Sequence, residues 1–568
     1  MNGWRWTARR CSRWRHSTAP RRAVGPRQRQ LFADRAAAVG ATLDAVDDTL
    51  LDELCRRLDG LPLALELAAT PPLVQPAGDQ RRGGAEPVGA AGRPPWPGTR
   101  SLDAALDLVY RLLDDERTVL QGAGIFAAPF DAVDLAAVCN LPEAVVRERL
   151  ATLVERSLVF RSGPQHRLLE TVRSDVRERL APEQRQALAR RHAQQLGRRV
   201  EALCAALRHA PDDEPIAAVR RLLPDLRQAF GTATADGDVE LALGLVCAGR
   251  DLAFDAMLPE LLLWGERAAA LGSAAGHPLT ADALAIAALG RWKMGDLDGM
   301  GRLLERAVAE SARLGIPDRY EVLGALGTED LARGRLERGI ERLSRSMHTP
   351  EVAGDPHRLA EGGATLLICR AYAHDPAADG TAARLLEEVA PRAGVVPAAW
   401  CWYAAGESAL DVDPELARRR LERAVALADA GGATFVAGVA GASLASLAVR
   451  GGRFDDAVQQ YRTLLPHWLR AGVSAPLWTM LRSAVELLLS VGADEAAARV
   501  LGAVTAPGSG NEVVGDDDRR LRAAAAVLVE RLGPGRYESC VAEGGLLDDA
   551  AAASEATAAF SAVPVGVG

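Results

Sequence analysis

The segments GDLDGMGRLLERAVAE (residues 295–310) and GRFDDAVQQYRTLL (residues 452–465) share one pattern, a glycine in a short turn followed by a helix with an apolar stripe. Each segment follows an alanine- or leucine-rich stretch that is itself typical of a helix. Gly334 and Gly492 stand at the same place in two further segments. A glycine there permits the tight turn that joins two paired helices. We therefore expect a helix–turn–helix unit at each of these positions.

The turns recur at a regular distance along the chain. Asp375-Pro376 and Asp413-Pro414 take the place of the glycine between the second and third of these units, and the six anchors are then 39, 41, 38, 39 and 40 residues apart. A helix pair repeated at this period is the signature of an α-solenoid, here a tetratricopeptide-like array with slightly long repeats. Ala445, Ala448 and Ala457 would let its helices approach closely. An ordinary helical bundle is the alternative, and the regular spacing argues against it.

Stacked repeats form a continuous core and a concave surface that usually binds peptides or other protein segments. Trp400, Trp402, Tyr403, Tyr461 and Trp468 are candidates for that surface. Aromatic residues in such arrays more often belong to the core. We therefore expect a protein partner or a small ligand on the solenoid, without a defined set of contacts.

A different pattern precedes the array. Leu102, Leu106, Val109 and Leu113 recur on one helical face, and a hairpin follows as two short extended runs around Ser162-Gly163-Pro164-Gln165. The predicted helices and extended runs between them are 114–124, 131–139, 142–156, 157–161 and 166–169. Helices followed by a hairpin are typical of a winged-helix domain.

The block CRRLDGLPLALELAA (Cys55 to Ala69) predicts one helix that ends at Gly60 and another that begins at Pro62. It resembles the GLPL motif of the STAND class of signal-transduction ATPases (NB-ARC-like), and HRLLETVR (residues 166–173) resembles that family's winged helix. The resemblance implies a bacterial LuxR-type transcriptional regulator of that class. It also implies that Leu61, Pro62 and Leu63 would contact adenine if a nucleotide binds. A proline that merely begins a helix is the simpler interpretation.

The nucleotide-binding core of that class is not recognisable in the chain. Its P-loop needs phosphate-facing glycines and a lysine followed by Ser or Thr. Lys293 is the single lysine, and neither a glycine-rich loop nor a Ser or Thr accompanies it. Leu168-Leu169-Glu170 replaces the family's Met-His-Asp triplet, and His166 is out of register with its histidine. We therefore expect the C-terminal part of such a regulator, a degenerate ATPase without its P-loop core.

No catalytic constellation and no metal-binding spacing of histidines occurs in the sequence, so we expect no enzyme, no catalytic or metal-ligating residues and no cofactor. ATPase activity would require a missing N-terminal core, and ATP or ADP would be the cofactor only in the complete family architecture. Direct DNA binding is not expected either, because the net charge is −8 and helix 142–156 carries as many acidic as basic residues. Those residues are Glu143, Glu148, Glu155, Arg147, Arg149 and Arg156.

Composition places the protein in the cytoplasm. The eight cysteines are scattered without a C-x-x-C pair, and no apolar run approaches the ~20 residues of a membrane span. Residues 1–30 hold nine arginines and no acid, and residues 71–100 hold seven prolines and six glycines. We expect both stretches to be disordered or, for the second, frameshifted, and we assign them no function.

The expected fold class is mostly α. In chain order we expect a disordered basic arm (1–30), a GLPL helical remnant (31–70), a linker or frameshifted segment (71–100), a winged-helix domain (101–182), a tetratricopeptide-like α-solenoid (183–560) and a tail (561–568). The leading hypothesis is a non-catalytic regulatory and signal-sensing protein, capable of homo-oligomerisation. The alternatives are an incomplete STAND ATPase regulator that binds ATP or ADP in its complete form, and a winged-helix DNA-binding factor.

Overall fold

The computed structural model describes residue 110 and residues 113–317, 319–506 and 516–562 of the chain. These residues are almost entirely helical, so the predicted fold class, mostly α with tetratricopeptide-like repeats, is confirmed. The arm 1–30, the GLPL remnant 31–70 and the segment 71–100 lie outside the described residues. The chain forms two compact units, Met1–His192 and Ala193–Gly568, and the boundary between them falls within one helix.

In the first unit, the described residues form a small group of helices with one hairpin. Its elements are α5 (Glu116–Ala123), α6 (Ala132–Cys139), α7 (Glu143–Glu155), β1 (Phe160–Ser162), β2 (Gln165–Arg167), α8 (Glu170–Arg179) and the beginning of α9 (Pro182–Leu207). Helices α5, α6 and α7 coincide within two residues with the predicted segments. Asp131 determines where α6 begins, because its carboxylate accepts a hydrogen bond from the backbone N–H of Asp134 at 2.8 Å.

The hairpin is shorter than the sequence predicted. Phe160 pairs with Arg167 and Ser162 with Gln165, and Gly163 has a φ of +63° in the turn. The predicted strand 157–161 is wrong in its first half, because Ser157 adopts a positive φ and the two apolar residues after it are buried against the helices. The chain therefore leaves α7 through a compact turn before it becomes extended. Helices followed by a hairpin remain the observed order.

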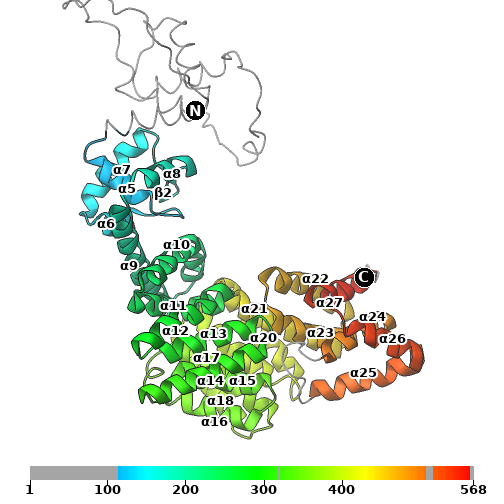
Figure 1. Ribbon diagram of the computed structural model, residues 1–568. Helices are drawn as coiled ribbons and strands as arrows, with labels where there is room; N and C mark the ends of the chain where they lie inside the picture. The colour runs from blue at the N-terminus through cyan, green and yellow to red at the C-terminus, as the bar shows by residue number, and fades with distance from the viewer. Residues whose placement is uncertain (1–109, 111–112, 318, 507–515, 563–568) are drawn as a thin grey trace, which may run out of the picture. The chain divides into compact units, whose positions relative to one another are not determined.

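The second unit consists of helices throughout. After the end of α9 come α10 (Glu214–Asp236), α11 (Val239–Asp255), α12 (Pro259–Ala275), α13 (Thr280–Lys293), α14 (Leu297–Leu314), α15 (Tyr320–Ala332), α16 (Leu336–Ser346), α17 (Pro356–Tyr372), α18 (Ala378–Arg384), a π-helix (Leu385–Val389), a 3-10 helix (Ala390–Arg392), α19 (Val395–Glu407), α20 (Pro414–Ala430), α21 (Thr434–Arg450), α22 (Phe454–Ala471), α23 (Ser474–Ser490), α24 (Asp494–Thr505), α25 (Asp516–Leu532), α26 (Pro534–Gly544) and α27 (Asp549–Ala562). From α11 to α24 they form stacked pairs (Figure 1). None of the described helices is long and apolar enough to cross a lipid bilayer.

Every predicted repeat anchor lies in the turn inside a helix pair. Gly295, Gly334, Gly452 and Gly492 have φ values of +80°, +67°, +72° and +78°, in the left-handed region that glycine enters at little cost. Asp413 instead caps α20 and accepts a hydrogen bond from the N–H of Leu416 at 2.9 Å. The spacing read from the sequence is therefore the spacing of the helix pairs.

The array begins earlier than these anchors indicated. Helices α11 and α12 form a further pair, and their turn escaped notice because Met257 rather than glycine takes the positive φ, +55°. A second series of glycines ends the later helix of successive pairs. Gly237, Gly276 and Gly315 close α10, α12 and α14 at intervals of 39 residues, each in the left-handed conformation.

The repeats coil until distant pairs meet. Helix α11 packs against α21, and α13 packs against α23, five pairs further along the chain. The rings of Phe254 on α11 and Phe435 on α21 mark the first of these contacts, with centroids 5.1 Å apart. The first helix of each pair faces the interior of this coil. These inner helices therefore surround one common inner surface.

Glycine at tight helix crossings provides a test of this packing. A Cβ at Gly265 in α12 would overlap the carbonyl oxygen of Ala283 in α13, whereas a Cβ at Gly244 in α11 would meet nothing within 4 Å. We predict that Gly265→Ala lowers the free energy of unfolding by about 1–3 kcal/mol. Gly244→Ala should be neutral or stabilising by up to about 1 kcal/mol. Denaturant unfolding measures both, and equal effects would contradict the helix contact described here.

Candidate functional site

The coil of the second unit encloses a cavity with a volume of about 350 Å³. Residues from α11, α13, α15, α17, α19, α21, α23 and α25 line it, so successive repeats each supply part of one wall. Its middle is aromatic. The rings that line it are Phe254, Trp292, Tyr320, Trp400, Tyr403 and Phe435. Such a mixture of apolar rings with a few polar groups is typical of small-molecule sites.

The aromatic rings hold one another in place. Phe254 lies 6.4 Å from Trp292, and Trp400 lies 5.9 Å from Phe435, measured between ring centroids. These four rings come from four helices, and their edge-to-face and stacked contacts stabilise the shape of the cavity. The wall is therefore preformed, and its side chains come from positions that are up to about 180 residues apart in the sequence.

The five aromatic candidates from the sequence divide between the cavity and the core. Trp400 and Tyr403 line the cavity. Tyr461 and Trp468 are fully buried in the helical core. Trp402 packs half-buried against the apolar cluster around Leu410. Leu61, Pro62 and Leu63, the candidate nucleotide contacts, lie outside the described residues, so their assignment stays a prediction.

One end of the cavity holds a buried charged network. Arg250 on α11 forms ion pairs with Glu361 on α17, with Glu321 on α15 at 3.4 Å and with its neighbour Asp251 at 3.2 Å. Arg358 on α17 also pairs with Glu321, at 3.5 Å. Burial alone would lower the pKa of Arg250, but the three carboxylates raise it well above its ordinary value. Three inward helices are thus joined through one guanidinium.

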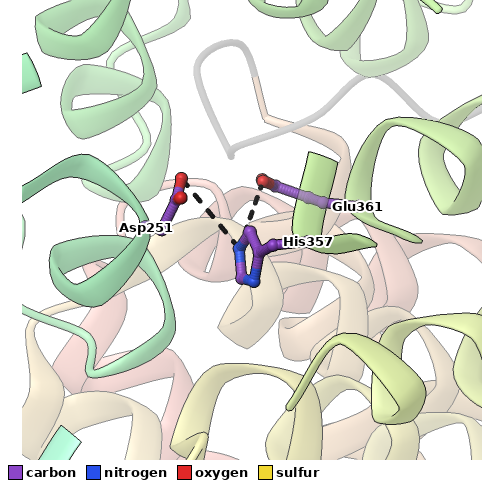
Figure 2. A group of neighbouring side chains, drawn as sticks. All are labelled: Asp251, His357 and Glu361. Carbon is purple, nitrogen blue, oxygen red and sulfur yellow. Dashed lines mark ion pairs between the residues drawn. The ribbon is translucent and has the colours of Figure 1, made fainter. Parts of the chain in front are cut away.

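His357 lies at the centre of three carboxylates in the same network. Its Nε2 atom is 3.5 Å from Asp255 Oδ2, 3.8 Å from Glu361 Oε2 and 4.0 Å from Asp251 Oδ1. Figure 2 shows His357 and Glu361 reaching from one helix, α17, toward Asp251 on α11. Burial alone would lower the pKa of His357, but Asp251, Asp255 and Glu361 outweigh it and raise that pKa.

Asp255 connects this network to the aromatic wall. Its Oδ1 atom accepts a hydrogen bond from Trp400 Nε1 at 3.0 Å, and the residue is fully buried. Burial raises the pKa of Asp255 to about 6, while His357 acts in the opposite direction. A change in the protonation or ligation of Asp255 would therefore directly alter its hydrogen bond with Trp400 in the wall.

Lys293 is enclosed beside the cavity rather than exposed to a phosphate. Its Nζ atom donates a hydrogen bond to the carbonyl oxygen of Phe254 at 3.2 Å and lies 3.7 Å and 3.2 Å from the centroids of the Phe254 and Phe435 rings. Burial lowers the pKa of Lys293 well below its ordinary value. It ends a helix, α13, so this lysine is part of the helical core.

The lining of the cavity carries a second polar group. Glu407 accepts hydrogen bonds from the Tyr372 hydroxyl at 2.8 Å and from the Ser443 hydroxyl at 2.6 Å. Burial raises the pKa of Glu407 above its ordinary value. Arg482 and Arg520 also line the cavity. The cavity thus offers donors, acceptors and charge beside its aromatic rings.

Sequence reasoning missed the charged network. Asp251 and Asp255, and likewise His357 and Glu361, are four residues apart, which places each pair on one face of a helix. The four residues come from helices about 100 positions apart in the chain, so no local motif contains them. Polar residues on the inner face of otherwise apolar helices were the available signal.

The fold and this cavity define a helical-repeat protein with an enclosed inner surface. No protein-family model matches the chain. Proteins of Mycobacterium bovis and Mycobacterium tuberculosis that are named as candidate HTH-type transcriptional regulators are 32% identical to it over 259 residues, which is 41% of this chain and 28% of theirs. An uncharacterised Mycobacterium tuberculosis protein is 35% identical over 170 residues, covering 27% of this chain and 42% of that protein.

A solved structure is also similar over much of the chain. It is a STAND protein with a tetratricopeptide repeat sensor from Pyrococcus horikoshii, with a TM-score of 0.48 and 15% identity, covering 91% of this chain and 74% of that one. The chain spans less than a third of the length of the mycobacterial regulators to which it is similar.

The hydrogen bond between Trp400 and Asp255 can be tested separately from ring packing. Trp400→Phe keeps an aromatic ring but leaves a buried carboxylate oxygen without its donor. We predict a loss of about 1.5–3 kcal/mol in the free energy of unfolding. Trp402→Phe is the matched control and should cost less than about 1 kcal/mol, because that ring is only half-buried. Similar losses in the two variants would contradict the role assigned to the indole N–H.

Proposed function

We propose that this chain is a non-catalytic regulatory protein that senses a small ligand in the cavity of its second unit. The observation that carries the proposal is the enclosure of a preformed aromatic cavity by inward helices of successive repeats. Its volume of about 350 Å³ falls within the range of small-molecule sites.

The lining indicates the class of ligand. Rings such as Trp292, Trp400 and Phe435 favour a flat apolar or aromatic body. Arg250, Glu361 and Glu407 in the same lining favour polar or charged groups on the ligand. We therefore propose an amphipathic molecule with an aromatic or unsaturated body.

Ligand binding would act on the coil of the array. The cavity is lined from α11 to α25, so a bound molecule touches repeats that meet only when the array is coiled. A ligand that contacts early and late repeats at once stabilises the coiled conformation of the array relative to a more open one. The resulting shift in population is the signal that we propose for this protein.

The regulators to which the chain is similar support a transcriptional output. We propose a cytoplasmic protein whose first unit transmits the state of the coil, without hydrolysis of ATP. Lys293 is buried between two aromatic rings, which supports the proposal that it does not bind a nucleotide phosphate. Nucleotide binding in a longer architecture and self-association stay predictions.

Filling the cavity tests this function. Gly324 on α15 lines the cavity, and a Cβ there would meet nothing within 4 Å, so Gly324→Trp should place an indole in the ligand space without disturbing the packing. Gly231→Trp on α10 is the matched control, because that glycine is exposed and equally unobstructed. The probe is anilinonaphthalene sulfonate, an aromatic anion whose fluorescence rises in apolar sites.

We predict saturable binding of one probe molecule per chain to the parent protein and to Gly231→Trp. Gly324→Trp should weaken that binding by at least about 10-fold, because the indole occupies part of the cavity. Fluorescence titration measures all three. Unchanged binding by Gly324→Trp, or no saturable binding by the parent protein, would exclude this cavity as the ligand site.

A further inference from the structure

Two pairs of side chains face each other between α11 and α17. Asp251 and Asp255 are one turn apart on α11, and His357 and Glu361 are one turn apart on α17. All four are buried, with exposed fractions of 7%, 0%, 1% and 6%. Ligands projecting in this way from facing helices are how helical proteins build metal centres. Asp251, His357 and Glu361 bring possible ligand atoms close together, and Asp255 lies beside His357.

The distances suit a metal ion. One possible ligand atom from each of Asp251, His357 and Glu361 lies within 4.8 Å of the other two. Asp255 Oδ2 is 3.5 Å from the same Nε2 atom. Oxygen and nitrogen ligands of a tetrahedral ion are ~3.4 Å apart when each is about 2.0–2.1 Å from the metal. A small inward movement of these side chains would complete the coordination.

Unsatisfied atoms point to the same place. Both ring nitrogens of His357 and the Oδ2 atom of Asp255 are buried and have no hydrogen-bond partner. Buried polar groups without partners are rare in folded proteins, and each one is expected to have an explanation such as an ion. An ion at the centre of the cluster would satisfy Nε2 and Oδ2 together.

The cluster holds more carboxylates than guanidinium groups. Four carboxylates meet around it, whereas two guanidinium groups pair with them. These residues are Asp251, Asp255, Glu321 and Glu361, with Arg250 and Arg358. Arg250 pairs with one carboxylate oxygen of Glu361 and one of Asp251, so the second oxygen of each carboxylate is left for further interactions.

We propose that Asp251, Asp255, His357 and Glu361 bind one divalent transition-metal ion of the class of Zn²⁺. One imidazole with several carboxylates matches the preferences of such ions. The ion would link the first helix pair to the fourth and would tie Asp255, and through it Trp400, into a fixed position. This site adds to the proposed ligand cavity and does not depend on it.

The test uses Co²⁺ as a spectroscopic substitute for Zn²⁺. The full chain is freed of metal with a chelator and dialysed, and Co²⁺ is titrated while the visible absorption is recorded. Binding of one equivalent with the intense bands of a low-coordinate nitrogen and oxygen site is expected. Competition by Zn²⁺ should remove those bands, whereas Mg²⁺ should not, because it demands octahedral coordination and keeps its water.

Variants locate the ion. His357→Gln and Asp255→Asn should each weaken Co²⁺ binding by at least about 10-fold, since each removes a ligand. His277→Gln is the control, because its Nε2 atom also meets a carboxylate, Glu240, at 3.0 Å, but outside the cluster. Circular dichroism verifies that each variant is folded, and Asp255→Asn keeps an oxygen for the indole of Trp400.

Three outcomes would overturn the proposal. The first is that the parent chain binds no Co²⁺ at one equivalent. The second is that several weak equivalents bind and persist in folded His357→Gln and Asp255→Asn. The third is that His277→Gln loses binding as strongly as the two cluster variants do.

Discussion

The contact of Arg250 with Glu361 is the constraint on which the second unit depends. It joins α11 to α17 across three helix pairs, and both side chains are largely buried. Glu321 and Asp251 share the same guanidinium, so α15 is drawn into the same network. A buried charge without its partner is strongly unfavourable, whereas the pair in place favours one arrangement of the helices. The coil, and therefore the enclosed cavity, needs these inner helices to stay together.

This arrangement would connect stability to the proposed sensing of a ligand. The network forms one end of the cavity, and the bond from Asp255 to Trp400 extends it to the aromatic wall. Any ligand or ion that alters these groups also alters the contacts that keep distant repeats together. A polar network inside a repeat protein is less favourable for stability than apolar packing, but it gives the coil a point of control.

The sequence predicted the helix pairs well because their turns are local. Gly295, Gly334, Gly452 and Gly492 each mark a backbone conformation that glycine adopts readily, and all four lie in the predicted turns. The helix pair whose turn contains Met257 was missed because that turn lacks glycine. The first strand of the hairpin was predicted to begin too early, because the sequence alone does not show that the residues after Ser157 are buried against the helices. The cavity and the charged network could not be predicted, since they depend on how far the array curves. Curvature results from small rotations between repeats, and one sequence does not reveal which distant helices meet.

The most direct measurement is a double-mutant cycle on Arg250 and Glu361. Arg250→Met, Glu361→Leu and the double variant are unfolded with denaturant in the presence of a chelator, so that no metal ion contributes. If the pair holds the coil, each single change costs several kcal/mol, the double change costs less than their sum, and the coupling energy is at least about 2 kcal/mol. A coupling energy below about 0.5 kcal/mol, with stability unchanged in the single variants, would contradict the account.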